Sequence, residues 1–131
     1  MQTIIELNSS LDSISKVEKF IDEISANVKI SSEIYGKILI ATIEAVNNAI
    51  VHGNKLNSNK IVRVKIESEG NRLKVIVEDE GPGFDFYNLP DPTTPQNIEN
   101  ISGRGVFLMR KLSDEINFFN NGSLVELIFY L

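Results

Sequence analysis

The sequence contains no cysteine, which excludes disulfide bridges and thiolate metal sites. Histidine occurs once, at His52, and the chain shows neither a cluster of metal-binding side chains nor a Ser-His-Asp arrangement. A glycine-rich loop ending in lysine is also missing, which excludes nucleotide binding of the P-loop type. The lack of cysteine is compatible with the cytoplasm, where we expect the protein to lie, although exported proteins often lack it too.

Long apolar runs and clusters of basic charge are absent as well. No uninterrupted apolar run approaches the length of a membrane span, and residues 1–7 lack the basic start and long apolar middle of a signal peptide. The formal net charge is −5, with lysine and arginine scattered along the chain. We therefore expect neither a membrane nor a nucleic acid as a main partner, whereas a basic protein partner suits this charge.

The composition that remains is that of an ordinary folded domain. The chain has 131 residues, 42% hydrophobic and 24% charged, so we expect one domain over residues 1–131 that folds without covalent cross-links. Apolar spacing of three and four residues predicts helices, and strict alternation predicts strands. In chain order the patterns predict a strand at 3–7, helices over 14–28 and about 31–51, strands at 62–66 and 73–77, a helix at about 105–113, and a hairpin of 115–119 with 124–131.

The order of these elements predicts the fold. Hairpins dominate and the helices fall in blocks, which indicates an α+β two-layer sandwich, a mixed, mostly antiparallel sheet with helices on one face. The last strand is apolar on both faces between Leu124 and Phe129, so we expect it inside the sheet and not at an edge. Residues 84–102 hold three prolines and several Asn, Asp and Thr residues, which predicts a long ordered loop or a mobile lid.

Glu44 and Asn48 are four residues apart on the second predicted helix, so they project from the same face. One interpretation is a solvated helix face. The other is a Mg²⁺-nucleotide site, because Mg²⁺ prefers hard oxygen ligands and needs only one from the protein when phosphates and water supply the rest. In that case Asn48 offers an uncharged oxygen, and Glu44 orients or deprotonates an attacking hydroxyl.

Asp79 ends a predicted strand and opens the segment Asp79-Glu80-Gly81-Pro82-Gly83. These residues are ordinary turn formers, so a plain turn is one interpretation. A buried Asp at a strand end can also accept a hydrogen bond from the exocyclic amine of adenine, where guanine carries an oxygen. Gly81 and Gly83 would then let the backbone approach the base closely.

Gly103-Arg104-Gly105 precedes the third predicted helix. Two glycines there leave backbone N–H groups free at the positive end of the helix dipole, which suits a phosphate. Glycine also precedes helices for conformational reasons alone, and Arg104 is either a phosphate contact or an exposed side chain. His52 stands where the second helix ends, so capping or packing is its expected role.

Together the three segments resemble the N, G1 and G2 boxes of the GHKL ATPase superfamily, which includes gyrase, chaperone, histidine kinase and mismatch-repair ATPases. The matching segments are 44–54, 79–84 and 103–109, in the family's order, and the resemblance covers the chain from about residue 10 to its end. Within the superfamily the chain is most similar to the stand-alone anti-sigma-factor serine kinases of the RsbW type. The features of that similarity are the Asn-Ala-x-x-His-Gly-Asn run at 48–54, Asp91-Pro92, and the run at 103–109 followed by Asp114-Glu115.

The resemblance implies a Bergerat-type ATP-binding fold that takes ATP with Mg²⁺. Asn48 would be the Mg²⁺ ligand, Glu44 the base that activates water or a substrate serine, and Asp79 the residue that reads adenine. The other boxes place Gly81 and Gly83 at the base pocket, and Gly103, Arg104 and Gly105 over the phosphates. Asn47, His52 and Lys55 lie near enough in sequence to line the phosphate side. From its length and composition, we expect the loop at 86–102 to reorder around the nucleotide.

Members of the resembled family phosphorylate a serine on a small anti-sigma-factor antagonist, bind a sigma factor when the antagonist is unavailable, and commonly act as homodimers. We adopt that hypothesis, a protein-serine kinase that also sequesters a sigma factor. The alternative is a nucleotide-gated protein-binding module with little or no phosphotransfer. Glu44 favours the kinase, but slow ATP hydrolysis would use the same residue. A fragment of a sensor histidine kinase fits less well, because His52 lies inside the nucleotide-binding segment. We interpret the chain from Met1 as a complete protein.

Overall fold

The computed structural model describes residues 1–84 and 101–131, apart from the side chains of 101–103. The expected loop at 84–102, with Asp91-Pro92, therefore lies almost entirely outside the described residues. The strands are β1 Gln2–Asn8, β2 Ile61–Glu69, β3 Arg72–Glu78, β4 Glu115–Phe119 and β5 Leu124–Tyr130. The helices are α1 Ile14–Ser25, α2 Ser32–Asn48 and α3 Ile101–Leu112, with 3₁₀ turns at Leu11–Ser13 and Asn120–Gly122 and a π-helical turn at Ala49–Gly53.

The strands form one sheet in the order β1-β2-β3-β5-β4, and each neighbouring pair is antiparallel. The register places apolar side chains opposite one another on the inner face, because side chains alternate between faces along each strand. One such row runs across the whole sheet through Ile5, Val64, Val77, Val125 and Phe118. Strand β5 lies between β3 and β4, which confirms the interior position expected from its two apolar faces.

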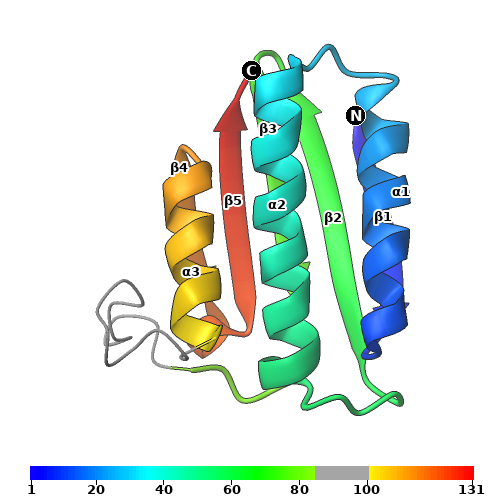
Figure 1. Cartoon of the computed structure of the whole chain (residues 1–131), viewed down its shortest axis with the longest axis vertical. Coiled ribbons are helices and arrows are strands. Elements are labelled where there is room, and N and C mark those ends of the chain that lie inside the picture. Colours follow the sequence, from blue (N-terminus) through cyan, green and yellow to red (C-terminus); the bar gives the residue numbers. More distant parts are fainter. Residues whose placement is uncertain (85–100) are drawn as a thin grey trace.

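The three α-helices lie side by side on one face of the sheet, with α2 between α1 and α3 (Figure 1). The two-layer α+β arrangement expected from the sequence is therefore confirmed. Helix α2 is capped at its N-terminus by Ser31, whose hydroxyl accepts a hydrogen bond from the Ile34 N–H at 3.3 Å. Its inner stripe, including Ile38, Ala41 and Ala45, is buried against the core. The small alanines let α2 approach the sheet closely.

The segment Ser32–Gly53 is 22 residues long and contains an 18-residue stretch with a mean hydropathy of 1.3, so by length and composition alone it could cross a membrane. The apolar composition of this segment is explained by its place in the core of the fold. Ile38, Val46 and Ile50 are at most 1% exposed because this helix fills the centre of the helical layer over the sheet. A central core helix is expected to be apolar on much of its surface.

Several helix boundaries differ from those expected. Helix α1 ends at Ser25, three residues before the expected end at 28. Helix α3 begins at Ile101, so the Gly103-Arg104-Gly105 segment lies inside its first two turns and does not precede it. Packing explains the earlier start, because Gly105, Val106 and Met109 are buried and α3 makes extensive contact with α2. Tertiary contacts of this kind override the low helix propensity of glycine. At its end, α2 widens into a π turn, where the Asn54 N–H bonds to the Ala49 carbonyl at 2.8 Å.

Candidate functional site

Asn48 is the last residue of α2, and its side chain carries a buried oxygen. The Oδ1 atom of Asn48 is buried and takes part in no hydrogen bond with the described residues. Leaving a buried acceptor unsatisfied costs about 1–3 kcal/mol, so such atoms call for a ligand or a bound water. A neutral amide oxygen is a ligand type that Mg²⁺ accepts. Within the described part of the chain, no group of three His, Asp or Glu side chains is placed to hold a metal by itself.

Gly105 of helix α3 lies against the side-chain amide of Asn48. A Cβ added at Gly105 would lie 2.9 Å from Asn48 Nδ2 and 3.0 Å from Oδ1, closer than side chains normally approach. Glycine at this position therefore leaves room for the Asn48 side chain between α2 and α3. The predicted N-box and G2-box segments thus meet at one point.

Asp79 follows the last residue of β3. Its N–H bonds to the Ser123 carbonyl at 2.9 Å, which continues the pairing of β3 with β5 by one residue. Its Oδ1 accepts a hydrogen bond from the Gly81 N–H at 2.7 Å, and among the described residues nothing donates to Oδ2. Burial raises the pKa of the Asp79 carboxyl above its usual value, the Gly81 N–H opposes this, and the nearby Glu78 carboxylate adds to it.

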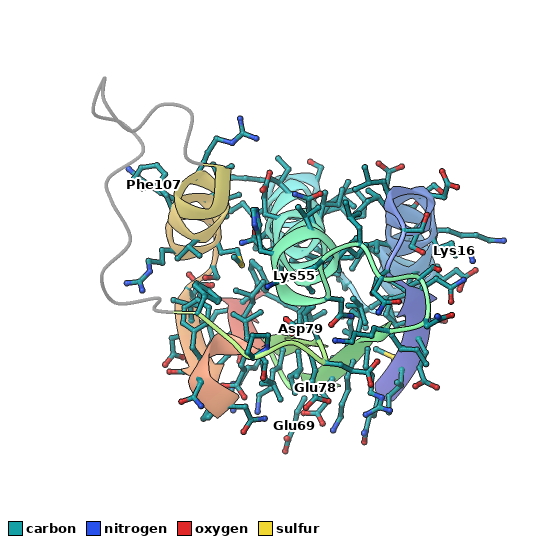
Figure 2. The ribbon with its side chains drawn as sticks, turned by 90° about the horizontal axis from the view of Figure 1, so that it is seen from below. Lys16, Lys55, Glu69, Glu78, Asp79 and Phe107 are labelled. Atoms are coloured by element: carbon teal, nitrogen blue, oxygen red, sulfur yellow. The ribbon has the colours of Figure 1, made fainter. Side chains whose placement is uncertain are left out.

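The turn after Asp79 packs tightly against the end of α2, in the region that Figure 2 views from below. A Cβ added at Gly81 would lie 2.1 Å from the Gly53 carbonyl oxygen, and one added at Gly53 would lie 2.4 Å from Asp79 Oδ2. Both positions therefore require glycine for the same reason, the close approach of the two segments. The α2 terminus and the turn at 79–81 are therefore in direct contact around the Asp79 carboxylate.

Between these groups the described residues enclose a cavity of about 340 Å³, within the usual range for small-molecule sites. Asn48 and His52 line it from α2 and its π turn, and Asp79 and Gly83 line it from the segment after β3. Most of the other wall is apolar and comes from the helices, the inner face of the sheet and the β4–β5 hairpin: Ala45, Ala49, Gly53, Val77, Phe84, Met109, Phe118, Gly122, Ser123 and Val125. The cavity therefore combines flat apolar walls with a carboxylate and an amide oxygen.

The β4–β5 hairpin contributes a wall that the motif analysis did not assign to the site. The Phe84 N–H bonds to the Asn121 carbonyl at 2.8 Å, and the Phe84 ring meets Phe118 edge to face with centroids 5.7 Å apart. Gly83 has a φ of +87°, and a Cβ there would lie 2.0 Å from the Asn121 carbonyl oxygen. For this wall, only the apolar residues carry a signal that is visible in the sequence, since Val77, Phe118 and Val125 fall on the inward positions of their strands.

The remaining predicted site residues lie outside these walls. Glu44 lies one helical turn before Asn48, Asn47 directly precedes Asn48, and both Glu44 and Asn47 are half-buried. Lys55 is exposed after the π turn with a φ of +54°, and Arg104 is exposed on α3. Gly103 lies in the first turn of α3. The structure thus gathers Asn48, His52, Asp79, Gly81, Gly83 and Gly105 in or directly behind the cavity wall. The role of each residue stays a prediction.

The arrangement suits a ligand with two different ends. A planar apolar group fits between the valine, methionine and phenylalanine side chains, and Asp79 Oδ2 can accept a hydrogen bond from an N–H group on its edge. At the α2 side, Asn48 Oδ1 can bind a cation that neutralises an anionic group. The N-terminal end of α3 adds a positive helix dipole.

Known proteins match this chain in sequence. The family model described as "Histidine kinase-like ATPase domain" matches residues 7–129. The serine-protein kinase RsbW of Bacillus subtilis is 37% identical over 99 residues, covering 70% of this chain and 62% of that protein. The anti-sigma F factor of Anoxybacillus flavithermus is 34% identical over 94 residues, covering 67% of this chain and 64% of that protein. The matched segment thus spans less than two thirds of these relatives.

A solved structure matches it in fold. The crystal structure of the RsbU and RsbW domains of a Mycobacterium tuberculosis protein superposes with a TM-score of 0.70. The match covers 100% of this chain and 32% of that chain, at 18% sequence identity. At that identity the likeness concerns the fold alone.

Proposed function

Because the chain belongs to the histidine kinase-like ATPase domain family, we propose that it binds ATP with Mg²⁺ in the cavity and is a protein-serine kinase. Its substrate in this proposal is a small anti-sigma-factor antagonist, and its second partner is a sigma factor. The names of the relatives, serine-protein kinase and anti-sigma F factor, support the kinase activity and the sigma-factor partner. We also propose a cytoplasmic protein, and a homodimer as the family resemblance of the sequence implies.

The observation that carries the ATP part is a pair of oxygens on two cavity-lining residues, Asp79 Oδ2 and Asn48 Oδ1, neither of which has a hydrogen-bond partner among the described residues. Asp79 Oδ2 accepts a hydrogen bond from the exocyclic amine of adenine, while the apolar walls of Val77, Met109 and Phe118 pack on the ring. Asn48 Oδ1 binds Mg²⁺ without adding a negative charge beside the phosphates. The bound Mg-ATP supplies the phosphoryl group and the positive charge that phosphoryl transfer requires.

In this proposal, other residues of the chain activate the substrate hydroxyl and bind the phosphates. Glu44 takes the proton of the attacking serine hydroxyl on its side-chain carboxylate, as a general base. His52 lines the cavity between Asn48 and the exposed Lys55, on the side that we assign to the phosphates. Gly103, Arg104 and Gly105 close over the phosphates from the N-terminal part of α3, where the helix dipole favours negative charge.

One observation favours a second function. Glu44 is not among the residues that line the cavity in the described part of the chain. If it stays away from the reacting groups, the protein is a nucleotide-gated binding module, in which ATP sets the affinity for a protein partner without efficient transfer.

The experiment that separates the two functions is transfer from γ-labelled ATP in the presence of Mg²⁺ and a cell extract of the source organism, with Glu44→Ala as the matched control. Label on a serine of one small protein, absent with the variant, establishes the kinase and identifies its antagonist. ATP binding without transfer indicates the binding module. Absence of ATP binding refutes both functions.

A further inference from the structure

The buried side chain of Asn54 connects the candidate adenine site to the rest of the fold. Asn54 directly follows the π turn and is 1% exposed. Its backbone is fixed by the bond from its N–H to the Ala49 carbonyl. A buried amide needs partners for both ends, so its hydrogen bonds show which parts of the chain it holds together.

The oxygen of Asn54 holds the turn that follows Asp79. Oδ1 accepts a hydrogen bond from the Glu80 N–H at 2.7 Å. Glu80 is fixed a second time through its side chain, because Oε2 accepts a hydrogen bond from the Ile61 N–H at 2.7 Å. The peptide group between Asp79 and Glu80 is therefore tied directly to the end of α2.

The nitrogen of Asn54 is anchored on the opposite side. Nδ2 donates to Ser9 Oγ at 2.8 Å and to the Ile61 carbonyl at 3.1 Å. Ser9 is itself 1% exposed and donates from Oγ to the Lys60 carbonyl at 2.7 Å. Every polar atom of the Asn54 side chain thus has a partner, and the anchor includes the end of β1 and the start of β2.

From this network we infer that Asn54 is a positioning residue that sets the location of the Asp79 carboxylate and, through it, the preference for adenine over guanine. The inference rests on the proposed ATP site. Gly53 and Gly81 bring the two segments into contact, but contact alone does not fix the position of the turn at 79–81 relative to the end of α2. The Asn54–Glu80 hydrogen bond fixes it one peptide away from Asp79. Displacements near 1 Å in a binding group can change activity by about a hundredfold.

Three variants separate the effect of Asn54 on the position of Asp79 from its effect on the stability of the protein. Asn54→Ala loses the bonds to Glu80, Ser9 and the Ile61 carbonyl. Ser9→Ala loses the Ser9 part of the anchor and its bond to Lys60, but keeps Asn54 Oδ1 facing the Glu80 N–H, so it is the matched control. Asn54→Asp keeps an oxygen opposite that N–H and tests rescue.

The experiment measures Kd for ATP and for GTP by calorimetry in Mg²⁺, at a temperature well below the melting temperature of each protein. We expect Asn54→Ala to lower the ATP preference at least about tenfold, Ser9→Ala to keep it despite a lower melting temperature, and Asn54→Asp to restore it toward the wild type. An unchanged preference in Asn54→Ala overturns the inference.

Two other results are also decisive. If Asn54→Ala does not fold, the result for Asn54→Asp decides. A retained preference for ATP in that variant supports the inference, and equal binding of ATP and GTP overturns it. If the wild-type protein binds no ATP, the proposed function fails first and the inference fails with it. The two failures are therefore distinguishable from the wild-type titration.

Discussion

Gly105 of α3 and Asn48 of α2 meet so closely that a Cβ at position 105 would lie 2.9 Å from Asn48 Nδ2. This contact joins two residues that are 57 positions apart in the sequence, and it holds the amide whose oxygen has no partner among the described residues. It also gives a direct test of the proposed Mg²⁺ ligand, because one methyl group changes the amide position without touching its chemistry.

We predict that Gly105→Ala displaces the Asn48 amide and weakens Mg-ATP binding about tenfold or more, since overpacking of this kind costs ~1–3 kcal/mol. Calorimetric titration of ATP with and without Mg²⁺ measures the effect, which should be confined to the Mg²⁺-dependent part. The matched control is Gly36→Ala on α2, where a Cβ meets nothing within 4 Å. That variant should bind normally and gain about 0.5–1 kcal/mol of stability. Equal Mg²⁺ dependence in Gly105→Ala and wild type would contradict the assignment.

Asp79→Asn should separate binding from stability. We expect ATP affinity to fall by about one to two orders of magnitude, because an amide group then faces the adenine amine in place of a carboxylate. The stability of the protein without nucleotide should stay equal or rise at pH 7. Calorimetry for ATP and thermal unfolding for the free protein measure the two effects. Undiminished ATP affinity would refute the role of Asp79 in reading adenine.

The stability difference between Asp79→Asn and wild type should also depend on pH. The folded-state pKa of Asp79 is raised above the usual 3.8 by burial, so the ionised carboxylate opposes folding at neutral pH. As the pH falls through the raised pKa toward 3.8, the carboxyl becomes protonated and this cost disappears. Unfolding by denaturant across this range should therefore show the advantage of the variant shrinking with acidification. A growing advantage at low pH would mean that the carboxylate stabilises the fold.

Glu44→Ala should retain ATP within about threefold of the wild-type affinity and lose phosphotransfer by about 10²–10⁴-fold, the usual contribution of a general base. Single-turnover transfer and ATP titration on the same preparation test both statements. Joint loss of binding and transfer would show that Glu44 supports the helix or the site structurally.

Gly122→Ala tests the hairpin wall of the cavity. A Cβ there would lie 2.9 Å from the Phe84 ring, and Gly122 has a φ of +99°. We expect a loss of roughly 1–3 kcal/mol of stability and weaker ATP binding, as strain and displacement of Phe84 add together. Gly70→Ala is the matched control, with a φ of +60° but open space around it. It should share the cost of strain, measured by denaturant unfolding, and leave the Kd for ATP unchanged.

The sequence predicts the layers of this fold well because each element carries its own period. The alternation at Val62, Val64 and Ile66, and the apolar stripe through Ile38, Ala41 and Ala45, specify which side of each element is buried. Boundaries were less predictable. The earlier start of α3 and the π turn after Asn48 depend on packing against other elements, which local propensity does not contain.

The candidate site could likewise be predicted from the sequence only in part. Motif spacing identified Asn48 and Asp79, and the structure places both on one cavity. It did not identify the role of Asn54, since the hydrogen bonds that define that role reach Ser9 and Glu80, 45 and 26 residues away. Nor did it identify the wall formed by Phe84 and Gly122, which comes together only when the β4–β5 turn packs on the segment after β3.

The most direct test of the account is a calorimetric titration of the wild-type protein with ATP and, separately, with GTP, both in Mg²⁺. We predict saturable binding of one ATP per chain, at least about tenfold tighter than GTP, since adenine and not guanine offers an exocyclic amine to Asp79 at this position. Absence of ATP binding, or equal affinity for the two nucleotides, would contradict it.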